Sequence, residues 1–186
     1  MGQIKDFEPE KLIMGIIYSD TDVLEKALKI LTDKFGEIED VCEEYSFSDE
    51  FSTYYDEELG GKGTRRICTF RELVPPDMQA EIKEFTNEVE AKFSRRINLD
   101  PGLLSTCRLM LPTTKPIGFR IPLKNGIHTE LTLFYSRGGW HKFPWTYRDY
   151  QSPKVQKFLS KVRNKYLAQR KINKANAEKL EKEQKI

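Results

Sequence analysis

Lys11-Leu-Ile-Met-Gly-Ile-Ile-Tyr18 contains a continuous apolar run near the start of the 186-residue chain. An apolar run of this length predicts a central strand that is buried on both faces. The segment ends at Ser19-Asp-Thr-Asp22, where Asp22 suits a helix N-cap and Glu25 closes a capping box. Apolar residues then recur at helical spacing, and Gly36 stands where a left-handed C-cap is expected. A helix should therefore follow the strand.

The elements that follow predict the fold class. We expect a strand over 38–47, a short helix or loop over 51–59, a strand over 66–70 and a helix from Pro75 to about Phe93. A further strand lies within Arg95–Lys115. The resulting βαββαβ order predicts an α+β fold with a ferredoxin-like split βαβ core.

Alternating apolar residues over 119–133 predict a β-hairpin that extends this sheet. A two-residue Asn-Gly turn would mix apolar and polar side chains on each face. A three-residue turn over Lys124–Gly126, with its glycine left-handed, keeps one face apolar. We therefore expect the three-residue turn, which pairs Arg120 with Glu130 and places His128 on the same polar face.

The last part of the chain is predicted to be a long basic helix. Apolar residues from Pro153 to Tyr166 indicate a helix that packs on the body to about residue 167 and then projects. Residues 154–186 carry eleven Lys/Arg and three Asp/Glu, against twenty and twenty-six in the remainder. A basic helix on an acidic body could bind nucleic acid, or it could dock on the acidic body itself. We divide the chain into one α+β domain over 1–152 and the helix over 153–186.

Composition excludes several classes of protein. Charged residues make up 32% and hydrophobic residues 38%, which is typical of a globular protein. No apolar run approaches the ~20 residues of a membrane helix. The first residues show no basic n-region followed by an apolar h-region, so we do not expect secretion. The three cysteines are far apart and form no Cys-x-x-Cys pair, so we expect free thiols in a reducing cytoplasm. No Cys/His spacing supports a zinc site.

Polar residues at both ends of a short apolar run make Arg95–Lys115 the first candidate site. Asn98 and Asp100 would share one face of an extended segment, or would bond local amides in an Asx-type turn. Thr113, Thr114 and Lys115 offer two hydroxyl donors and one charge to an oxyanion or phosphate. Lys115 could equally be a surface lysine before a proline.

The hairpin and the segment after it supply the other candidates. Arg120 with Glu130 could bind a ligand or form a cross-strand ion pair, and His128 could act as a general base because histidine titrates near neutrality. A divalent metal such as Mg²⁺ could bind Asp100 and Glu130. Trp145, Tyr147 and Tyr150 could stack on a ring, or they could pin the last helix to the sheet.

Several pieces of the chain together resemble one prokaryotic family with no assigned function, domain-of-unknown-function family 4416. The matching pieces are Lys11-Leu-Ile-Met-Gly-Ile-Ile-Tyr-Ser19, Tyr54-Tyr55 with Gly60, Phe85-Thr-Asn-Glu88, Asn98-Leu-Asp-Pro-Gly102, Thr113-Thr-Lys115, and Pro144-Trp-Thr-Tyr147 with Asp149-Tyr150. The chain departs from the family at Leu103, where an aromatic residue is expected. The resemblance covers residues 10–150 and implies no known reaction.

Two functions are compatible with these patterns. The first is a cytoplasmic protein that binds an anionic, nucleotide-like ligand and handles phosphate esters. Its expected catalytic residues are Asp100, His128 and Glu130, and its expected ligand-binding residues are Asn98, Thr113, Thr114, Lys115, Arg120, Trp145 and Tyr147. The second is a non-catalytic nucleic-acid-binding or adaptor module that uses residues 154–186.

Overall fold

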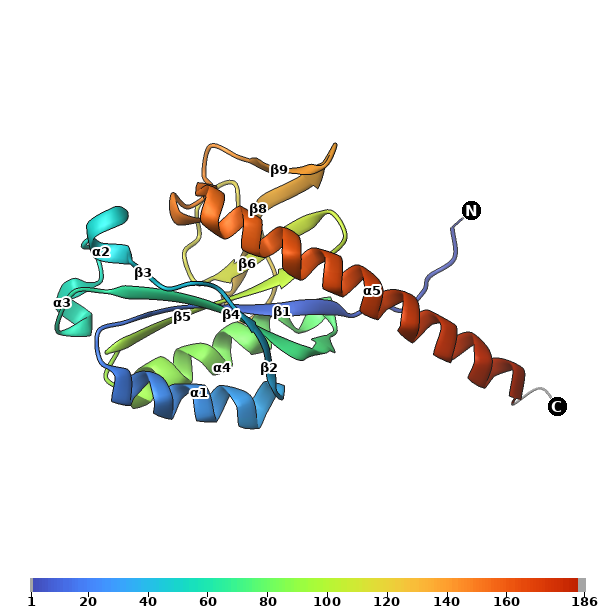
Figure 1. Cartoon of the computed structure of the whole chain (residues 1–186), viewed down its shortest axis with the longest axis horizontal. Helices are drawn as coiled ribbons and strands as arrows, with labels where there is room; N and C mark the ends of the chain where they lie inside the picture. Colours follow the sequence, from blue (N-terminus) through green and yellow to red (C-terminus); the bar gives the residue numbers. More distant parts are fainter. Residues whose placement is uncertain (1, 184–186) are drawn as a thin grey trace.

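The computed structural model describes residues 2–183, with side chains to residue 176, and it shows one antiparallel sheet with helices on both faces (Figure 1). The strand order is β2-β4-β1-β5-β6-β8-β7, with β3 beside β4 and β9 beside β8. The strands are β1 (Glu10–Tyr18), β2 (Ile38–Val41), β3 (Tyr45–Ser46), β4 (Thr64–Val74), β5 (Ile97–Leu104), β6 (Arg108–Thr113), β7 (Ile121–Pro122), β8 (His128–Ser136) and β9 (Gly139–Lys142). The helices are α1 (Thr21–Phe35), α2 (Phe47–Glu50), α3 (Asp56–Leu59), α4 (Gln79–Lys92) and α5 (Pro153–Glu183), with 3-10 turns η1 (Pro76–Met78) and η2 (Asp149–Gln151).

The predicted central position of β1 is confirmed. All nine of its residues are buried, and it pairs antiparallel with β4 on one side and β5 on the other. Leu12, Met14 and Ile16 pack into the core under α1 and α4, whereas Ile13 belongs to the core under α5. Figure 1 shows α1 and α4 on one face of the sheet and α5 across the other. Both faces of β1 are therefore covered, as its unbroken apolar sequence requires.

The first helix forms where it was expected, but its N-cap is not the predicted residue. Asp20 caps α1, because its Oδ1 accepts hydrogen bonds from the N–H groups of Asp22 at 2.9 Å and Val23 at 3.4 Å. Asp22 instead lies in the first turn, where a negative charge suits the helix dipole. At the other end Gly36 adopts a φ of 86° and donates to Thr32 O at 2.9 Å.

The predicted turn of the hairpin over 119–133 is confirmed, but the polar face of this hairpin is not exposed to solvent. Ile121 pairs with Thr129, and Gly126 has a φ of 75°. Arg120 and Glu130 are nonetheless buried, whereas the apolar side chains that alternate with Arg120 are 38–61% exposed: Phe119, Ile121 and Leu123. The cause is the loop before α5, which packs on the polar side of the hairpin and offers hydrogen-bond partners there.

Helix α5 docks on the acidic body. Its apolar stripe is buried, namely Val155, Phe158, Leu159, Val162 and Tyr166. Lys161 and Lys165 both donate to the buried Asp40 at 2.6 Å. Contacts extend slightly past the expected residue 167, because Arg170 pairs with Glu8, and residues 171–176 are then exposed. Within residues 2–183, no helix combines the length and the apolarity needed to cross a bilayer.

Candidate functional site

The site is built where β5 and β6 stop pairing. The two strands are bonded only at Leu103–Met110 and Leu104–Leu109, although β5 starts at Ile97. Close approach at this junction requires Gly102, since a Cβ there would lie 2.6 Å from Leu111 Cδ2. On the N-terminal side of this glycine β5 pairs with β1 alone, and its other edge faces a space between strands.

Side chains of α4 replace the missing strand partner of Leu99. The carboxylate of Glu90 accepts the Leu99 N–H at 2.6 Å, and Lys83 Nζ donates to the Leu99 carbonyl at 2.9 Å. Both side chains are buried. Burial raises the pKa of Glu90, and the nearby Lys83 charge opposes that shift. The backbone N–H and carbonyl of Leu99 at the unpaired edge of β5 thereby have hydrogen-bond partners, although no strand pairs with that edge.

This space opens into a cavity of about 520 Å³, called here the β5–β6 cavity. Its volume lies within the range of small-molecule sites. The lining includes five basic residues, Arg65, Lys83, Arg95, Lys115 and Arg148, and three acidic ones, Glu90, Asp100 and Asp149. It also includes six aromatic residues, Phe47, Phe51, Tyr54, Tyr55, Tyr147 and Tyr150.

A buried arginine forms one end of the cavity. Arg65 is 2% exposed, and its guanidinium lies 3.0 Å from Asp100 Oδ2 and 3.3 Å from Asp149 Oδ2. Burial raises the pKa of Asp149, and the Arg65 charge opposes that shift. The guanidinium fits because Gly15 carries no side chain: a Cβ there would lie 2.5 Å from Arg65 Nη2.

Arg65 lies close in sequence to two other basic residues, Lys62 and Arg66. In the structure Lys62 pairs with Asp49, and Arg66 pairs with Glu44. Arg65 alone points into the cavity, because successive side chains of a strand alternate between faces. The available signal was the glycine inside the apolar run of β1, since a glycine within a strand often marks the close approach of another group.

Six of the ten predicted site residues line the cavity together. They are Asn98, Asp100, Thr113, Thr114, Lys115 and Tyr147. Residues 47–55 also contribute, through the aromatic rings of α2 and the loop after it. Burial, followed by the charges of Glu130 and Asp100, raises the pKa of Tyr147 to about 12.

Arg120 and Glu130 stand behind the cavity wall. Arg120 Nε donates to Glu130 Oε2 at 2.8 Å, and both side chains are almost completely buried. The two terminal nitrogens of Arg120 reach forward, to Lys115 O at 2.9 Å and to the Tyr147 hydroxyl at 3.1 Å. The pair therefore holds two lining residues in place without lining the cavity itself.

His128 and Trp145 also lie outside the lining. His128 pairs with Thr113 across β8 and β6, at the far side of that strand from the cavity. Trp145 stacks between Phe119 and Phe143, with ring centroids 4.7 and 5.0 Å apart, and its indole N–H donates to Leu131 O at 2.9 Å. Trp145 thus occupies a structural position.

Asp100 and Glu130, the pair that could have shared a divalent metal, do not meet. Asp100 lines the cavity, whereas Glu130 is bonded to Arg120 behind its wall. Among the residues that the structure describes, no three His, Cys, Asp or Glu side chains gather closely enough to hold a metal ion.

Comparisons with known proteins give one match. A family model described as "Domain of unknown function (DUF4416)" matches residues 8–166. A search of curated proteins and a search of solved structures each found no match.

Proposed function

The chain belongs to the DUF4416 family, which assigns it no activity, and from its geometry we propose that it binds a small anionic ligand with a planar ring in the β5–β6 cavity. The observation that carries this proposal is the set of unpaired cations in the cavity lining. The aromatic residues around them supply the faces on which a ring would stack.

Three of the five basic lining residues already have partners. Lys83 donates to a backbone carbonyl, Arg95 pairs with Glu58, and Arg65 lies between two aspartates. In the part of the chain that the structure describes, no carboxylate is at ion-pair distance from Lys115 or Arg148. Lys115 Nζ instead lies 5.4 Å from the centre of the Tyr54 ring. Lys115 and Arg148 have no carboxylate partner among the described residues, and the same lining contains the hydroxyls of Thr113 and Thr114. Together these groups support binding of a phosphate or carboxylate.

If a phosphate-ester reaction takes place in this cavity, Asp100 is the residue that would transfer the proton. Of the three residues proposed to move a proton, it alone lines the cavity. One of its oxygens accepts from Arg65 at 3.0 Å, and the side chain is 34% exposed, so ligand can reach it. In this proposal Lys115 binds the phosphate, and Arg120 and Glu130 act as positioning residues.

We also propose that the core of the fold is ferredoxin-like and that the protein is located in the cytoplasm. The order β2-β4-β1-β5 with antiparallel neighbours supports a ferredoxin-like core, to which β6, β8 and β7 add. Buried free thiols at Cys42 and Cys68 support a reducing compartment such as the cytoplasm.

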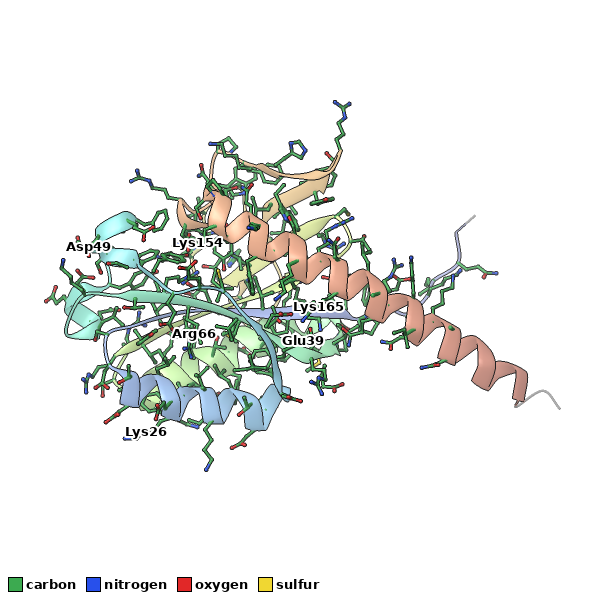
Figure 2. The ribbon with its side chains drawn as sticks, viewed as in Figure 1. Lys26, Glu39, Asp49, Arg66, Lys154 and Lys165 are labelled. Carbon is green, nitrogen blue, oxygen red and sulfur yellow. The ribbon has the colours of Figure 1, made fainter. Side chains whose placement is uncertain are left out.

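Thermal denaturation of the full chain with nucleotides and sugar phosphates tests the ligand proposal. A ligand at a hundred times its Kd stabilises the folded state by about 2.7 kcal/mol, which raises the Tm by roughly 5–10 °C for a chain of this size. We expect at least one such ligand to do so and Lys115→Ala to abolish the shift. The matched control is Lys26→Ala, whose side chain projects from α1 into solvent (Figure 2). Equal shifts in Lys115→Ala and the wild type would refute the site.

A further inference from the structure

The wall of the cavity that Lys115 and Tyr147 line presents hydrogen-bond donors. Arg120 can only donate, so the Tyr147 hydroxyl that it contacts at 3.1 Å must accept. That hydroxyl keeps its own proton free to donate toward the cavity. Lys115 adds an ammonium group, and its backbone carbonyl is held by the same arginine at 2.9 Å. An anion bound at this wall meets a hydroxyl and a backbone segment that Arg120 already holds in place.

The β5 wall presents acceptors. Asn98 Oδ1 is buried and no group in the described part of the chain donates to it. The Asn98 amide nitrogen lies 3.5 Å from Glu90 Oε1, an oxygen that already accepts the Leu99 N–H. Turning the amide over would place two oxygens against each other, so Glu90 fixes the orientation of Asn98. Asp100, two residues along the same face, offers its second carboxylate oxygen.

These two walls require different chemistry from one ligand. A bare phosphate satisfies Lys115 but leaves Asn98 Oδ1 without a donor, and an unpaired buried acceptor costs binding energy. A cationic amine could donate to Asn98 and Asp100. The lining, however, holds five basic and three acidic residues, and this excess of positive charge disfavours a cationic group on the ligand. Neutral hydroxyl groups meet both conditions.

We infer that the ligand is a phosphorylated sugar, free or as part of a nucleoside monophosphate, with its phosphate at Lys115 and its hydroxyls at Asn98 and Asp100. The inference rests on the proposed function and adds which end of the ligand lies at each wall of the cavity. The free sugar and the nucleotide share this chemistry, and the six lining rings supply a stacking surface for a base in the second case.

Isothermal titration of the full chain with four compounds tests the inference. They are inorganic phosphate, ribose 5-phosphate, a nucleoside 5′-monophosphate and phosphoethanolamine. We expect ribose 5-phosphate to bind about tenfold more tightly than phosphate, since the hydrogen bonds to Asn98 and Asp100 together are worth about that factor. Phosphoethanolamine should bind no more tightly than phosphate. Tighter binding of the monophosphate than of ribose 5-phosphate assigns the nucleotide as ligand; equal binding assigns the sugar alone.

Two substitutions separate the walls. Asn98→Ala should remove the preference for the sugar and leave phosphate binding unchanged, whereas Lys115→Ala should weaken both. Asn164→Ala, an exposed asparagine on α5, is the control for Asn98→Ala. Circular dichroism establishes that each variant is folded, and Asp100→Asn repeats the β5-wall test.

The outcomes distinguish this inference from the proposed function. If phosphate and ribose 5-phosphate bind alike and Lys115→Ala weakens both, the anion site stands and the sugar inference is wrong. The inference is also overturned if phosphoethanolamine binds most tightly, or if Asn98→Ala and Asp100→Asn leave the preference for the sugar intact. If none of the four compounds binds, the proposed function and the inference are wrong together.

Discussion

At the scale of single residues, Gly15 makes room for the buried arginine that lines the cavity. Gly15 lies in the middle of β1, opposite Asp100 on β5 and Ile67 on β4. Its missing side chain gives the Arg65 guanidinium its place beside two aspartates. The apolar run around Gly15 predicted the strand correctly, because burial on both faces is a local pattern. It could not identify Arg65 as the partner, because that depends on which strand becomes the neighbour.

Replacing Gly15 with alanine should therefore destabilise the protein. The added Cβ would lie 2.5 Å from Arg65 Nη2 and 3.1 Å from the Tyr150 hydroxyl. The guanidinium cannot withdraw without leaving Asp100 and Asp149, so we expect a loss of about 1–3 kcal/mol in the free energy of unfolding.

Urea denaturation at pH 7 measures this loss. Gly139→Ala is the matched control, because a Cβ at that strand position meets nothing within 4 Å. A variant at position 15 that is as stable as the control would show that Arg65 is free to move.

At the scale of elements, helix α5 is attached to β2 through one buried carboxylate. Asp40 is 5% exposed, and it accepts from Lys161 and Lys165, which extend from successive turns of the helix. Burial alone would raise the pKa of Asp40, but the hydrogen bonds and charges of the two lysines outweigh it and hold that pKa below its usual value of 3.8. Sequence alone left open whether the basic helix docks on the acidic body, since charge balance does not say which carboxylate is buried.

The stability contributed by Asp40 should depend on pH in a defined direction. A carboxyl whose pKa is lower in the folded state stabilises the protein above its unfolded pKa, and this stability is lost as the pH falls through the folded pKa. Asp40→Asn should therefore cost about 1 kcal/mol at pH 7, a modest value because both lysines are substantially exposed. The difference from wild type should shrink below pH 4.

Urea denaturation of both proteins at pH 7, 5, 4 and 3 tests this. Asp33→Asn, an exposed aspartate near the end of α1, is the control and should change stability little. A cost of Asp40→Asn that stays constant down to pH 3 would show that the Asp40 contact is not electrostatic.

At the scale of the whole molecule, local patterns and long-range contacts account for different parts of the structure. The order of elements, the first helix and the turn at Lys124–Gly126 were predicted, because each depends on neighbouring residues. The cavity exists because β5 and β6 separate and because Glu90 and Lys83 bond the backbone of Leu99 where a neighbouring strand would otherwise do so. Neither feature produces a recognisable pattern in the local sequence. Six of the ten candidates therefore line the cavity, Arg120 and Glu130 support the lining, and His128 and Trp145 lie outside it.

The same architecture separates the two candidate functions of the chain. The cavity lining ends at Tyr150, whereas the basic charge that could bind nucleic acid lies on α5. Lys161, Lys165 and Arg170 are already paired with the body, and residues 171–176 are exposed. Deleting residues 171–186 should therefore leave the Kd of the cavity ligand within a factor of two of wild type.

The same deletion measures what the end of the helix contributes to nucleic-acid binding. If residues 171–186 bind RNA, the full chain should lose affinity for a single-stranded oligonucleotide steeply as salt rises, and the deletion should flatten that salt dependence. Fluorescence anisotropy at 50 and 200 mM salt, with the Tm of both chains as the folding control, provides the comparison. RNA binding that is unchanged by the deletion would remove the alternative function, whereas loss of cavity-ligand binding would show that the helix end supports the site.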